Sequence, residues 1–443
     1  MNWNQKAIVG WRMNHIMISL PNWLQFSAFE SEAPDWLINF RQQQEKALRQ
    51  QGLPTQKNER WKYADFSQLN TSSFSKVMRS SVEKTKTLQT VIDSFRIQHP
   101  DSIFLVFENG YFIPSLSALD RLPPHVIACS LPEACKTHAS LVETFFKKEL
   151  ETERYPFASL NAANFQDGLF FYLADHQTLT APIHLLFIAS HSQAFIAHPK
   201  HLLVLGKNSK LTLIEDYISL DAQSYMMNTV TNILVQEAAQ LEHYKIQSEN
   251  TQAIHLAASF IEQEQNSKVT CLHFSSGGAF AREEVIVSLQ GQGAECSTSG
   301  FYRLEQDKQY IDYHIDILHA APHTQSRMLY KGIVDKKSRA VFNGRLHVEK
   351  GAQKIIAHQE NHNLLLSTTA EVNSKPELEI YSDDVKCKHG ATTGQINQET
   401  LFYLCSRGIP RDTAQRILLK GFADDVLQRI KQPDIKIRLQ ELV

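Results

Sequence analysis

Short apolar runs fill the middle of the chain. From about residue 165 to about residue 395, nearly every apolar segment is about 5 to 8 residues long and is enriched in Val, Ile, Leu, Phe and Tyr. Runs of this length and composition are typical of strands, and helical periodicity is nearly absent. The pattern therefore predicts a long body made of short strands.

A small polar group recurs just before these strands. The first three intervals between its positions are 30, 28 and 27 residues, the next is 44, and the last is 14. An irregular repeat of this kind is typical of a β-solenoid, in which each coil buries its apolar face against its neighbours. A large antiparallel sandwich also has short strands with frequent turns, so the pattern alone leaves both folds open. The positions are Ser209, Ala239, Ser267, Ala294, Ser338 and Ala352.

Helical and mixed patterns precede this body. The segment from residue 31 to residue 52 predicts a helix with Ser31 as its cap, Pro34 in its first turn and Gly52 as its stop. The Ser/Thr/Lys-rich stretch from Thr71 to Thr87 is interpreted as a flexible connection.

A hairpin and a second helical stretch follow. Asn109-Gly110 separates two apolar runs within Ser102–Ile113, which predicts a hairpin with a type I′ turn. A short, mostly helical stretch is predicted from Leu141 to Glu153.

Two helices are predicted after the strand-rich body. The first runs from Gln398 to Ser406, and the second opens at Asp412 as its cap. The second carries an apolar stripe that steps by four from Ala414 to Ile430, and the tail from Lys431 is short and charged.

The patterns divide the chain into four parts. We expect an N-terminal extension over 1–30, a mostly helical domain with a hairpin over 31–155, a β core over 156–395 and a helical domain over 396–443. The apolar stretch of the extension is interrupted by polar residues, so we interpret it neither as a signal peptide nor as a membrane span.

Charge and cysteine content narrow the classes of function. The 443 residues carry 45 Lys+Arg and 47 Asp+Glu, a net charge of −2, which argues against nucleic acid as the main ligand. No later segment approaches the length of an apolar membrane span. The six cysteines are scattered without a C-x-x-C pair, so we expect reduced thiols and a cytoplasmic protein.

Cys387 and His389 form a C-x-H pair in the last predicted strand. Residues two apart on a strand point the same way, so the thiol and the imidazole would project together while Lys388 faces away. Such a pair suits iron, zinc or copper, but two donors do not complete a tetrahedral site. A buried cysteine beside a hydrogen-bonded core histidine is the structural alternative.

Other constellations are weaker. The same C-x-H spacing recurs at Cys271 and His273, where we favour coincidence. The segment His358–His362 has Glu360 in its third position, which matches neither zinc-protease helix pattern. A cysteine hydrolase using Cys387 and His389 as a dyad remains an alternative, although neighbouring strand positions seldom supply both groups.

The chain resembles the SufB/SufD family, whose members are scaffold subunits of the SUF iron–sulfur cluster assembly machinery. The resemblance is carried by "PELEIYSDDVKCKHGAT" (Pro376–Thr392), "GLPTQKNERWKYADF" (Gly52–Phe66) and "FASLNAANFQDGLFFYL" (Phe157–Leu173). The second of these motifs and the short N-terminal region resemble the SufD branch more than the SufB branch. The resemblance to the family covers almost the whole chain from about residue 30 onward.

The resemblance implies a fold and a set of roles. It implies a right-handed parallel β-helix, flanked by N-terminal and C-terminal helical domains, in a scaffold with no catalysis of its own. His389, with Cys387 beside it, would be a transient metal contact that supplies part of an iron–sulfur cluster assembly site shared with a SufB-like subunit. That subunit would pair with the end of the β-helix, and the chain alone could form a homodimer. A purely architectural role is the alternative.

The C-terminal helices imply a second partner. They resemble the segment that docks a SufC-like ABC ATPase, to which any ATPase activity would belong. The residues expected to carry the docking are Phe402, Tyr403, Arg407 and Phe422. Cys405 lies in the same segment, and we expect it to be a packing residue.

Overall fold

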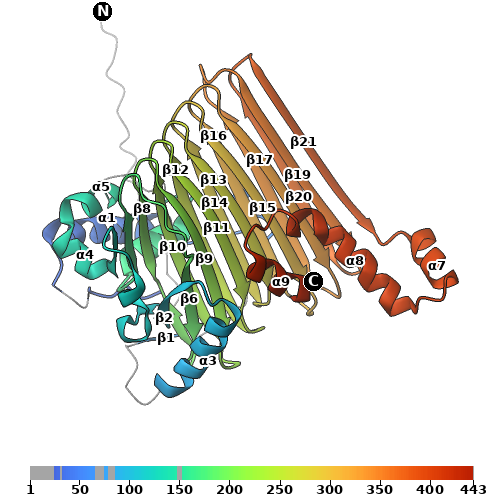
Figure 1. Ribbon diagram of the computed structural model, residues 1–443, viewed down its shortest axis with the longest axis horizontal. Coiled ribbons are helices and arrows are strands. Elements are labelled where there is room, and N and C mark those ends of the chain that lie inside the picture. The colour runs from blue at the N-terminus through green and yellow to red at the C-terminus, as the bar shows by residue number, and fades with distance from the viewer. Residues whose placement is uncertain (1–23, 30–31, 65–73, 78–84, 147–151, 443) are drawn as a thin grey trace, which may run out of the picture.

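The structure is a computed structural model that describes residues 24–29, 32–64, 74–77, 85–146 and 152–442 (Figure 1). Most of the expected N-terminal extension, the predicted cap Ser31 and most of the predicted connection from Thr71 to Thr87 lie outside the described residues. Within that connection, the strand β1 (Ser75–Lys76) is described, and the helix α3 (Thr85–Gln98) begins before its end.

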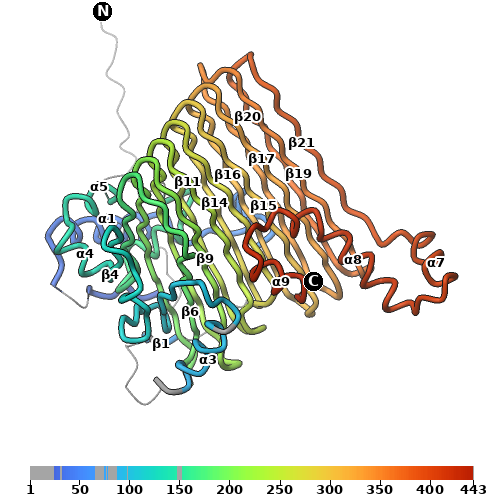
Figure 2. The backbone as a smooth tube through the Cα atoms, viewed as in Figure 1, coloured from blue at the N-terminus to red at the C-terminus, as the bar shows by residue number. Residues whose placement is uncertain are grey.

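The body is a β-solenoid of about eight turns built from two sheets (Figures 1 and 2). The eleven-stranded sheet A runs in the order β20-β18-β16-β14-β12-β10-β8-β5-β4, with β7 and β1 beside it. The ten-stranded sheet B runs in the order β21-β19-β17-β15-β13-β11-β9-β6-β2-β3. Successive strands alternate between the sheets, and neighbours within a sheet are parallel along the whole body. The solenoid is confirmed, and the antiparallel sandwich is excluded.

The strands of sheet A in the body are β8 (Lys200–Leu205), β10 (Tyr225–Val235), β12 (Ala253–Gln263), β14 (Phe280–Leu289), β16 (Tyr310–His319), β18 (Arg339–Val348) and β20 (Glu371–Ile380). Those of sheet B are β6 (Ile183–Ala189), β9 (Lys210–Ser219), β11 (Gln240–Ser248), β13 (Lys268–Ser276), β15 (Glu295–Leu304), β17 (Gln325–Val334), β19 (Ile355–Leu365) and β21 (Val385–Gln395). The remaining strands are β2 (Ile103–Glu108), β3 (Tyr111–Phe112), β4 (Val126–Ser130), β5 (Leu169–Leu173) and β7 (Phe195–Ala197).

The predicted hairpin opens sheet B. β2 and β3 pair antiparallel around Asn109 (φ 50°) and Gly110 (φ 86°), as a type I′ turn requires. β2 also pairs in parallel with β6, and β4 pairs with β5 of sheet A. Both sheets therefore begin within residues 31–155.

The sequence repeat follows one corner of the solenoid. Ser209, Ala239, Ser267, Ala294 and Ala352 all precede strands of sheet B, whereas Ser338 precedes β18 of sheet A. The equivalent residue before β17 is Thr324, and with it the five intervals become 30, 28, 27, 30 and 28 residues. The interpretation of the 44-residue interval as a break in the repeat was wrong. That interval runs from a residue before a strand of sheet B to a residue before a strand of sheet A, so it compares two different corners of the solenoid.

A left-handed residue shapes each turn at this corner. The backbone amide of each such residue donates to a carbonyl of the next coil, as Asn208 does to Glu237 at 2.9 Å. These turns stack into a hydrogen-bonded column that fixes the register between coils. The residues are His176, Asn208, Ala238, Asn266, Gly293, His323 and Lys354.

Helices cover the outer faces of the early and middle coils. α1 (Asp35–Gln51), α4 (Leu131–Thr137), α5 (Ala139–Phe146) and α6 (Pro156–Asn164) lie on sheet A, and α3 lies on β2 and β6 of sheet B. The last element group, α7 (Gln398–Ser406), α8 (Arg411–Leu427) and α9 (Pro433–Leu442), follows β21. α8 and α9 fold back over the middle of sheet B, while α7 projects from the body (Figure 1).

Several helix boundaries differ from those predicted. α1 begins at Asp35 with Pro34 as its N-cap rather than in its first turn. α5 begins at Ala139, before the predicted start at Leu141, and residues 147–151 of the predicted stretch lie outside the described residues. α8 begins at Arg411, so Asp412 is a first-turn residue and not the cap. The predicted bounds of α7 are confirmed, and Gly52 ends α1.

Four of the described α-helices were not predicted. α3 begins within the predicted connection and continues past its end, and α4 precedes the helical stretch predicted from Leu141. α6 stands at the start of the expected β core, and α9 stands where the sequence indicated a short charged tail. The face of α8 that packs on the solenoid is wider than the predicted stripe. It includes the predicted residues Ala414 and Val426, with Phe422 partly buried, and it adds Leu419, Ala423 and Leu427.

Candidate functional site

The last coil of the solenoid is open at its edges and little covered on its outer faces by the described residues. Lys375 of β20 forms an ion pair with Glu59 of the N-terminal region at 2.8 Å. β20 ends the order of sheet A and β21 ends that of sheet B, so each strand is paired on one side only. All residues of both strands are half-buried or exposed. An edge strand presents unpaired backbone N–H and C=O groups and is a template for pairing with another chain.

Cys387 and His389 lie on the inner side of β21. In the register of the sheet, Cys387 is the partner of Ala357 and His389 is the partner of Gln359, and both partners on β19 are fully buried inward positions. Lys388, between them, is the partner of the exposed His358 and so belongs to the outer face. The thiol and the imidazole therefore project to the same side, at the open end of the solenoid.

The two side chains differ in environment. Cys387 is half-buried against the interior core, and burial raises the pKa of its thiol, whereas His389 is exposed. A nucleophilic cysteine needs a lowered pKa. The raised pKa does not favour a hydrolase dyad, and a metal ion that binds Cys387 would displace the thiol proton, which makes such binding pH-dependent.

A buried amide lies under His389. Gln359 donates through Nε2 to the carbonyl of Gly344 at 2.9 Å, while its Oε1 has no hydrogen-bond partner within the described residues. A Cβ at Gly344 would stand 2.3 Å from that Nε2, so glycine there makes room for the amide. The floor of the open end is thus polar and tightly packed.

The described part of the chain does not complete a metal site by itself. Across the described ranges, no group of three or more His, Cys, Asp or Glu side chains is arranged to hold a metal ion. Within those ranges, Cys387 and His389 remain a pair of donors without a third.

The other sequence candidates are structural. Cys271 and His273 are buried on β13, and His273 Nδ1 lies 2.9 Å from the hydroxyl of Tyr330. Burial raises the pKa of the Cys271 thiol and lowers that of the His273 imidazole. The segment from His358 to His362 forms part of β19, which confirms that it is no zinc-protease helix.

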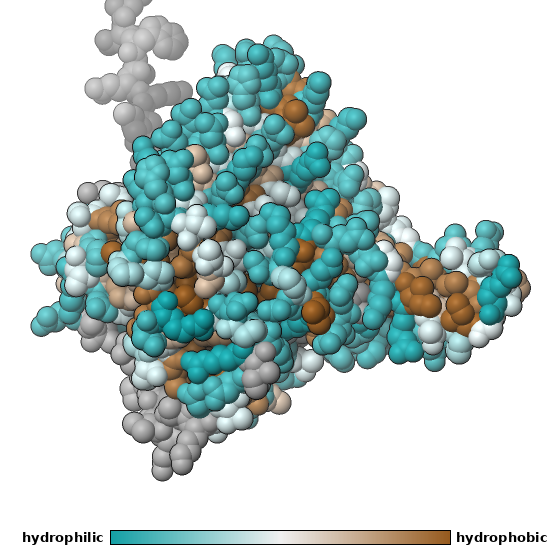
Figure 3. Space-filling view, in the orientation of Figure 1, coloured by the Kyte–Doolittle hydropathy of each residue, from teal (hydrophilic) through white to brown (hydrophobic). Residues whose placement is uncertain are grey.

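The C-terminal residues expected to dock a partner separate into two places. Phe402 and Tyr403 are 74% and 54% exposed on α7, and the guanidinium of Arg407 lies 5.2 Å from the Tyr403 ring. Figure 3 shows an apolar patch on this projecting arm. Phe422 instead lies on α8 against the solenoid, with Lys331 Nζ 4.7 Å from its ring. Cys405 is half-buried on α7 and is not a core position.

The N-terminal motif binds the outer face of sheet A. Trp61 is buried, with the guanidinium of Arg282 3.6 Å from its ring centre. Arg60 reaches Asp316 at 3.3 Å and Glu284 at 3.4 Å. The sequence indicated this motif only through the family resemblance and did not predict its contacts. The acidic residues Glu284 of β14 and Asp316 of β16, opposite in charge to Arg60, were the signal that could have predicted them.

Comparison with known proteins identifies the family to which this chain belongs. Residues 187–422 match the family described as "SUF system FeS cluster assembly, SufBD core domain", and residues 25–185 match "SufBD protein N-terminal region". The chain belongs to the SufBD family. The resemblance carried by the sequence motifs is confirmed, and the family assigns the protein a role in iron–sulfur cluster assembly.

Individual relatives span nearly the whole SufBD chain. The iron–sulfur cluster assembly protein SufD of Escherichia coli (strain K12) is 30% identical over 417 residues, 92% of each chain. A SufBD family protein of Synechocystis is 29% identical over 416 residues, 92% of this chain and 90% of its own. SufD of Bacillus subtilis (strain 168) is 24% identical over 423 residues, 93% of this chain and 94% of its own. In the part of the SufBD chain that is described, no helix has the length and apolarity of a membrane span.

Proposed function

We propose that this protein is a scaffold subunit of a SUF complex and supplies part of an iron–sulfur cluster assembly site that lies between two subunits. The observation that carries the proposal is the pair of donors, Cys387 and His389, on the inner side of an open terminal strand. Because two donors do not close a tetrahedral iron site, the remaining ligands come from another chain.

The second chain is a SufB-like subunit that pairs with the end of the solenoid. Strand addition at β20 and β21 would satisfy the free backbone groups of both edges at once. It would also bring the partner's side chains over the inner face that holds Cys387 and His389. Without that subunit, a second copy of this chain is the occupant that can pair with the same end.

The ATPase of the complex is a SufC-like subunit that docks on α7. Phe402 and Tyr403 provide the exposed aromatic anchor, and Arg407 beside them provides a charged contact. Phe422 supports this surface from below by holding α8 on the solenoid. ATP hydrolysis belongs to the docked subunit, and the complex works in the cytoplasm, where thiols stay reduced.

In this mechanism, the docked ATPase controls access to the cluster assembly site. ATP binding draws the docked helices of the two scaffold subunits together, and this movement opens the contact between the solenoid ends. Iron and sulfide then assemble on ligands from both chains, with His389 and Cys387 as this chain's contribution. A site with half its donors on each side releases its cargo after a modest rearrangement, and imidazole is a pH-sensitive ligand that favours transient binding.

The test is co-expression of the three subunits with His389→Ala, and with His358→Ala as the matched control. His358 is also exposed near the edge but faces outward from β19. We expect iron and sulfide per complex to fall at least about tenfold in His389→Ala and to stay unchanged in His358→Ala, with subunit ratios constant in both. Unchanged iron and sulfide in His389→Ala would establish a purely architectural subunit instead.

A further inference from the structure

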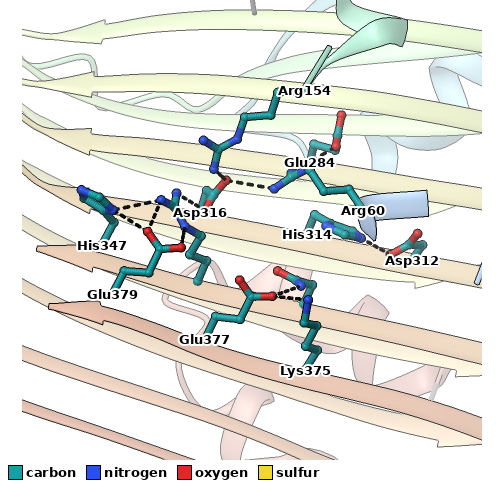
Figure 4. Close-up of polar contacts among 12 residues, drawn as sticks. Arg60, Arg154, Glu284, Asp312, His314, Asp316, His347, Lys375, Glu377 and Glu379 are labelled. Carbon is teal, nitrogen blue, oxygen red and sulfur yellow. Dashed lines mark hydrogen bonds and ion pairs between the residues drawn. The ribbon is translucent and has the colours of Figure 1, made fainter. Parts of the chain in front are cut away.

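Charged side chains form a ladder across the outer face of sheet A, directed toward its open edge (Figure 4). In the register of the sheet, Asp316 of β16 lies beside Arg345 of β18, and Arg345 lies beside Glu377 of β20. The sign of the charge therefore alternates from one coil to the next.

Inside the ladder, a charged side chain forms ion pairs with residues of both neighbouring strands. Arg345 lies 3.2 Å from Asp316 on the preceding strand and 2.5 Å from Glu379 on the following strand. Asp316 in turn receives Arg60 at 3.3 Å and Arg154 at 2.6 Å in addition to Arg345. The acid of β16 is thus enclosed by cations, and its side chain is only 8% exposed.

The glutamates of β20 have a neighbouring strand, β18, on one side only. Glu371 pairs back to Arg339 of β18 at 2.6 Å, and Glu379 pairs back to Arg345. Glu377 accepts from Asn343 of β18 and pairs with Lys375 of its own strand. The side chains of Glu371, Glu377 and Glu379 remain 57%, 28% and 36% exposed, respectively. With three glutamates and one lysine, the outer row of β20 carries a net charge of −2.

The other open edge has the opposite sign. The outer row of β21 contains the exposed residues Lys386 and Lys388, followed by uncharged residues, and so carries a net charge of +2. One end of the solenoid therefore presents an acidic edge on sheet A and a basic edge on sheet B.

We propose that the two open edges select their partner strands by charge. The strand that pairs with β20 carries Lys or Arg on its outer row and continues the alternation of the ladder, and the strand that pairs with β21 carries Asp or Glu. Opposite charges on neighbouring strands stabilise the pairing and like charges destabilise it, which sets partner choice and register. This inference rests on the proposed function, in which a second subunit pairs with this end.

The same charges disfavour pairing of like edges in two copies of this chain. If β20 of one copy lay beside β20 of another, two rows of net charge −2 would oppose each other, and the two β21 rows of +2 would do the same. Natural edge strands use charge in this way to prevent self-association. Where like edges of two chains meet, the favoured occupant is therefore a different chain, with a basic row for β20 and an acidic row for β21.

The test exchanges the two edges within the full-length chain. In the variant Glu377→Lys/Glu379→Lys/Lys386→Glu/Lys388→Glu, the net charge of the chain stays at −2, so general electrostatic attraction is preserved. We expect its Kd for the SufB-like subunit of the same organism to rise about tenfold for each exchanged edge and about a hundredfold in all.

The matched control exchanges two exposed ion pairs in coils away from the open edge, Lys207 with Glu237 and Lys268 with Glu295. This variant keeps the net charge and should bind with an unchanged Kd. If the edge-exchanged chain fails to fold, the neutral variant with Gln at all four edge positions replaces it, and we expect about tenfold weaker binding with reduced salt sensitivity.

The two hypotheses fail in different ways. If the edge-exchanged and neutral variants bind the SufB-like subunit within about twofold of the natural chain, selection by charge is wrong while pairing at this end stands. If the natural chain pairs only with a second copy of itself, the proposed chemistry of the partner is wrong. If cysteine crosslinks place the SufB-like subunit elsewhere on the natural chain, the proposed function fails.

Discussion

The first and last coils are built from the same repeat but present opposite surfaces. In β6 and β8 every residue is buried, whereas β20 and β21 contain no buried residue. The difference comes from the covering helices, because α3, α4 and α6 pack on the early strands and no described helix packs on the last two. The covered end stabilises the fold, and the bare end is available for a partner.

The charges of the two regions differ in the same way. Asp216 of β9 is fully buried between His184 and Arg438, while Glu379 of β20 is paired on one side and otherwise exposed. A buried ion pair costs much to break because one charge is left in an apolar environment, whereas an exposed pair is screened by solvent. Variants that break contacts in the two regions should therefore have effects of very different size.

The largest effect is expected at the buried ion pair. Arg438→Met removes the guanidinium, which lies 2.9 Å from Asp216 Oδ1 through Nη2, and leaves a buried carboxylate with only His184 at 3.3 Å. We expect the free energy of unfolding to fall by about 3–5 kcal/mol in urea denaturation. Lys431→Met breaks a pair with Glu242 on the same face, in which the lysine side chain is 67% exposed, and should cost less than about 1 kcal/mol. Equal losses would contradict the comparison.

Acid should loosen the covered coils before the open edge. Burial lowers the pKa of His201 and of His319 to about 4 each. An unfolded histidine titrates near about 6.5, so below that pH the unfolded state binds more protons and stability falls until about pH 4, by up to about 3 kcal/mol for each histidine.

The open edge should keep its charges in the same range. The hydrogen bond from Arg345 is the main cause that lowers the pKa of Glu379 to about 2, so its stabilising contact is lost only as the pH falls toward that value. Hydrogen exchange at about pH 7 and about pH 4.5 should show β8 and β16 losing protection. His201→Gln should reduce the loss in β8, and uniform loss along the solenoid would argue against this cause.

A glycine-to-alanine substitution, which adds one methyl group, should affect the packed coils and the last coil differently. A Cβ at Gly300 of β15 would stand 2.2 Å from the ring of Tyr330, whereas one at Gly390 of β21 meets nothing within 4 Å. We expect Gly300→Ala to lower the free energy of unfolding by about 1–3 kcal/mol, because the core is overpacked. Gly390→Ala should change it by less than about 0.5 kcal/mol, as measured by chemical denaturation.

The smallest effect on stability is expected on α7. Phe402→Ser/Tyr403→Ser removes side chains that are 74% and 54% exposed, so the free energy of unfolding should change by less than about 0.5 kcal/mol. Docking of the SufC-like subunit should nevertheless be lost in a pull-down with purified subunits. Ile437→Ser, a 58% exposed apolar position on α9, is the control and should dock normally. Normal docking of the double variant would remove α7 from the proposed contact.

Prediction from the sequence succeeded where local patterns and local structure agree. The strand body, the Asn109-Gly110 hairpin and the bounds of α7 follow from period, turn chemistry and capping. α6 was missed because all nine of its residues are buried, which leaves no polar stripe to reveal a helix. α9 was missed because only Ile435 and Leu439 are buried, and their partners lie on distant strands.

The sequence by itself determined that residues 387 and 389 share one side of a strand, because side chains alternate along every extended backbone. It also indicated the repeat length in the coils from residue 209 to residue 294, since a small buried residue recurs before each strand of sheet B. Only the tertiary structure decided that this side faces inward at an open edge, that the ladder from Asp316 ends at the glutamates of β20, and that Phe422 faces the solenoid. These properties depend on which elements cover which face, and that is set by packing between segments far apart in the chain.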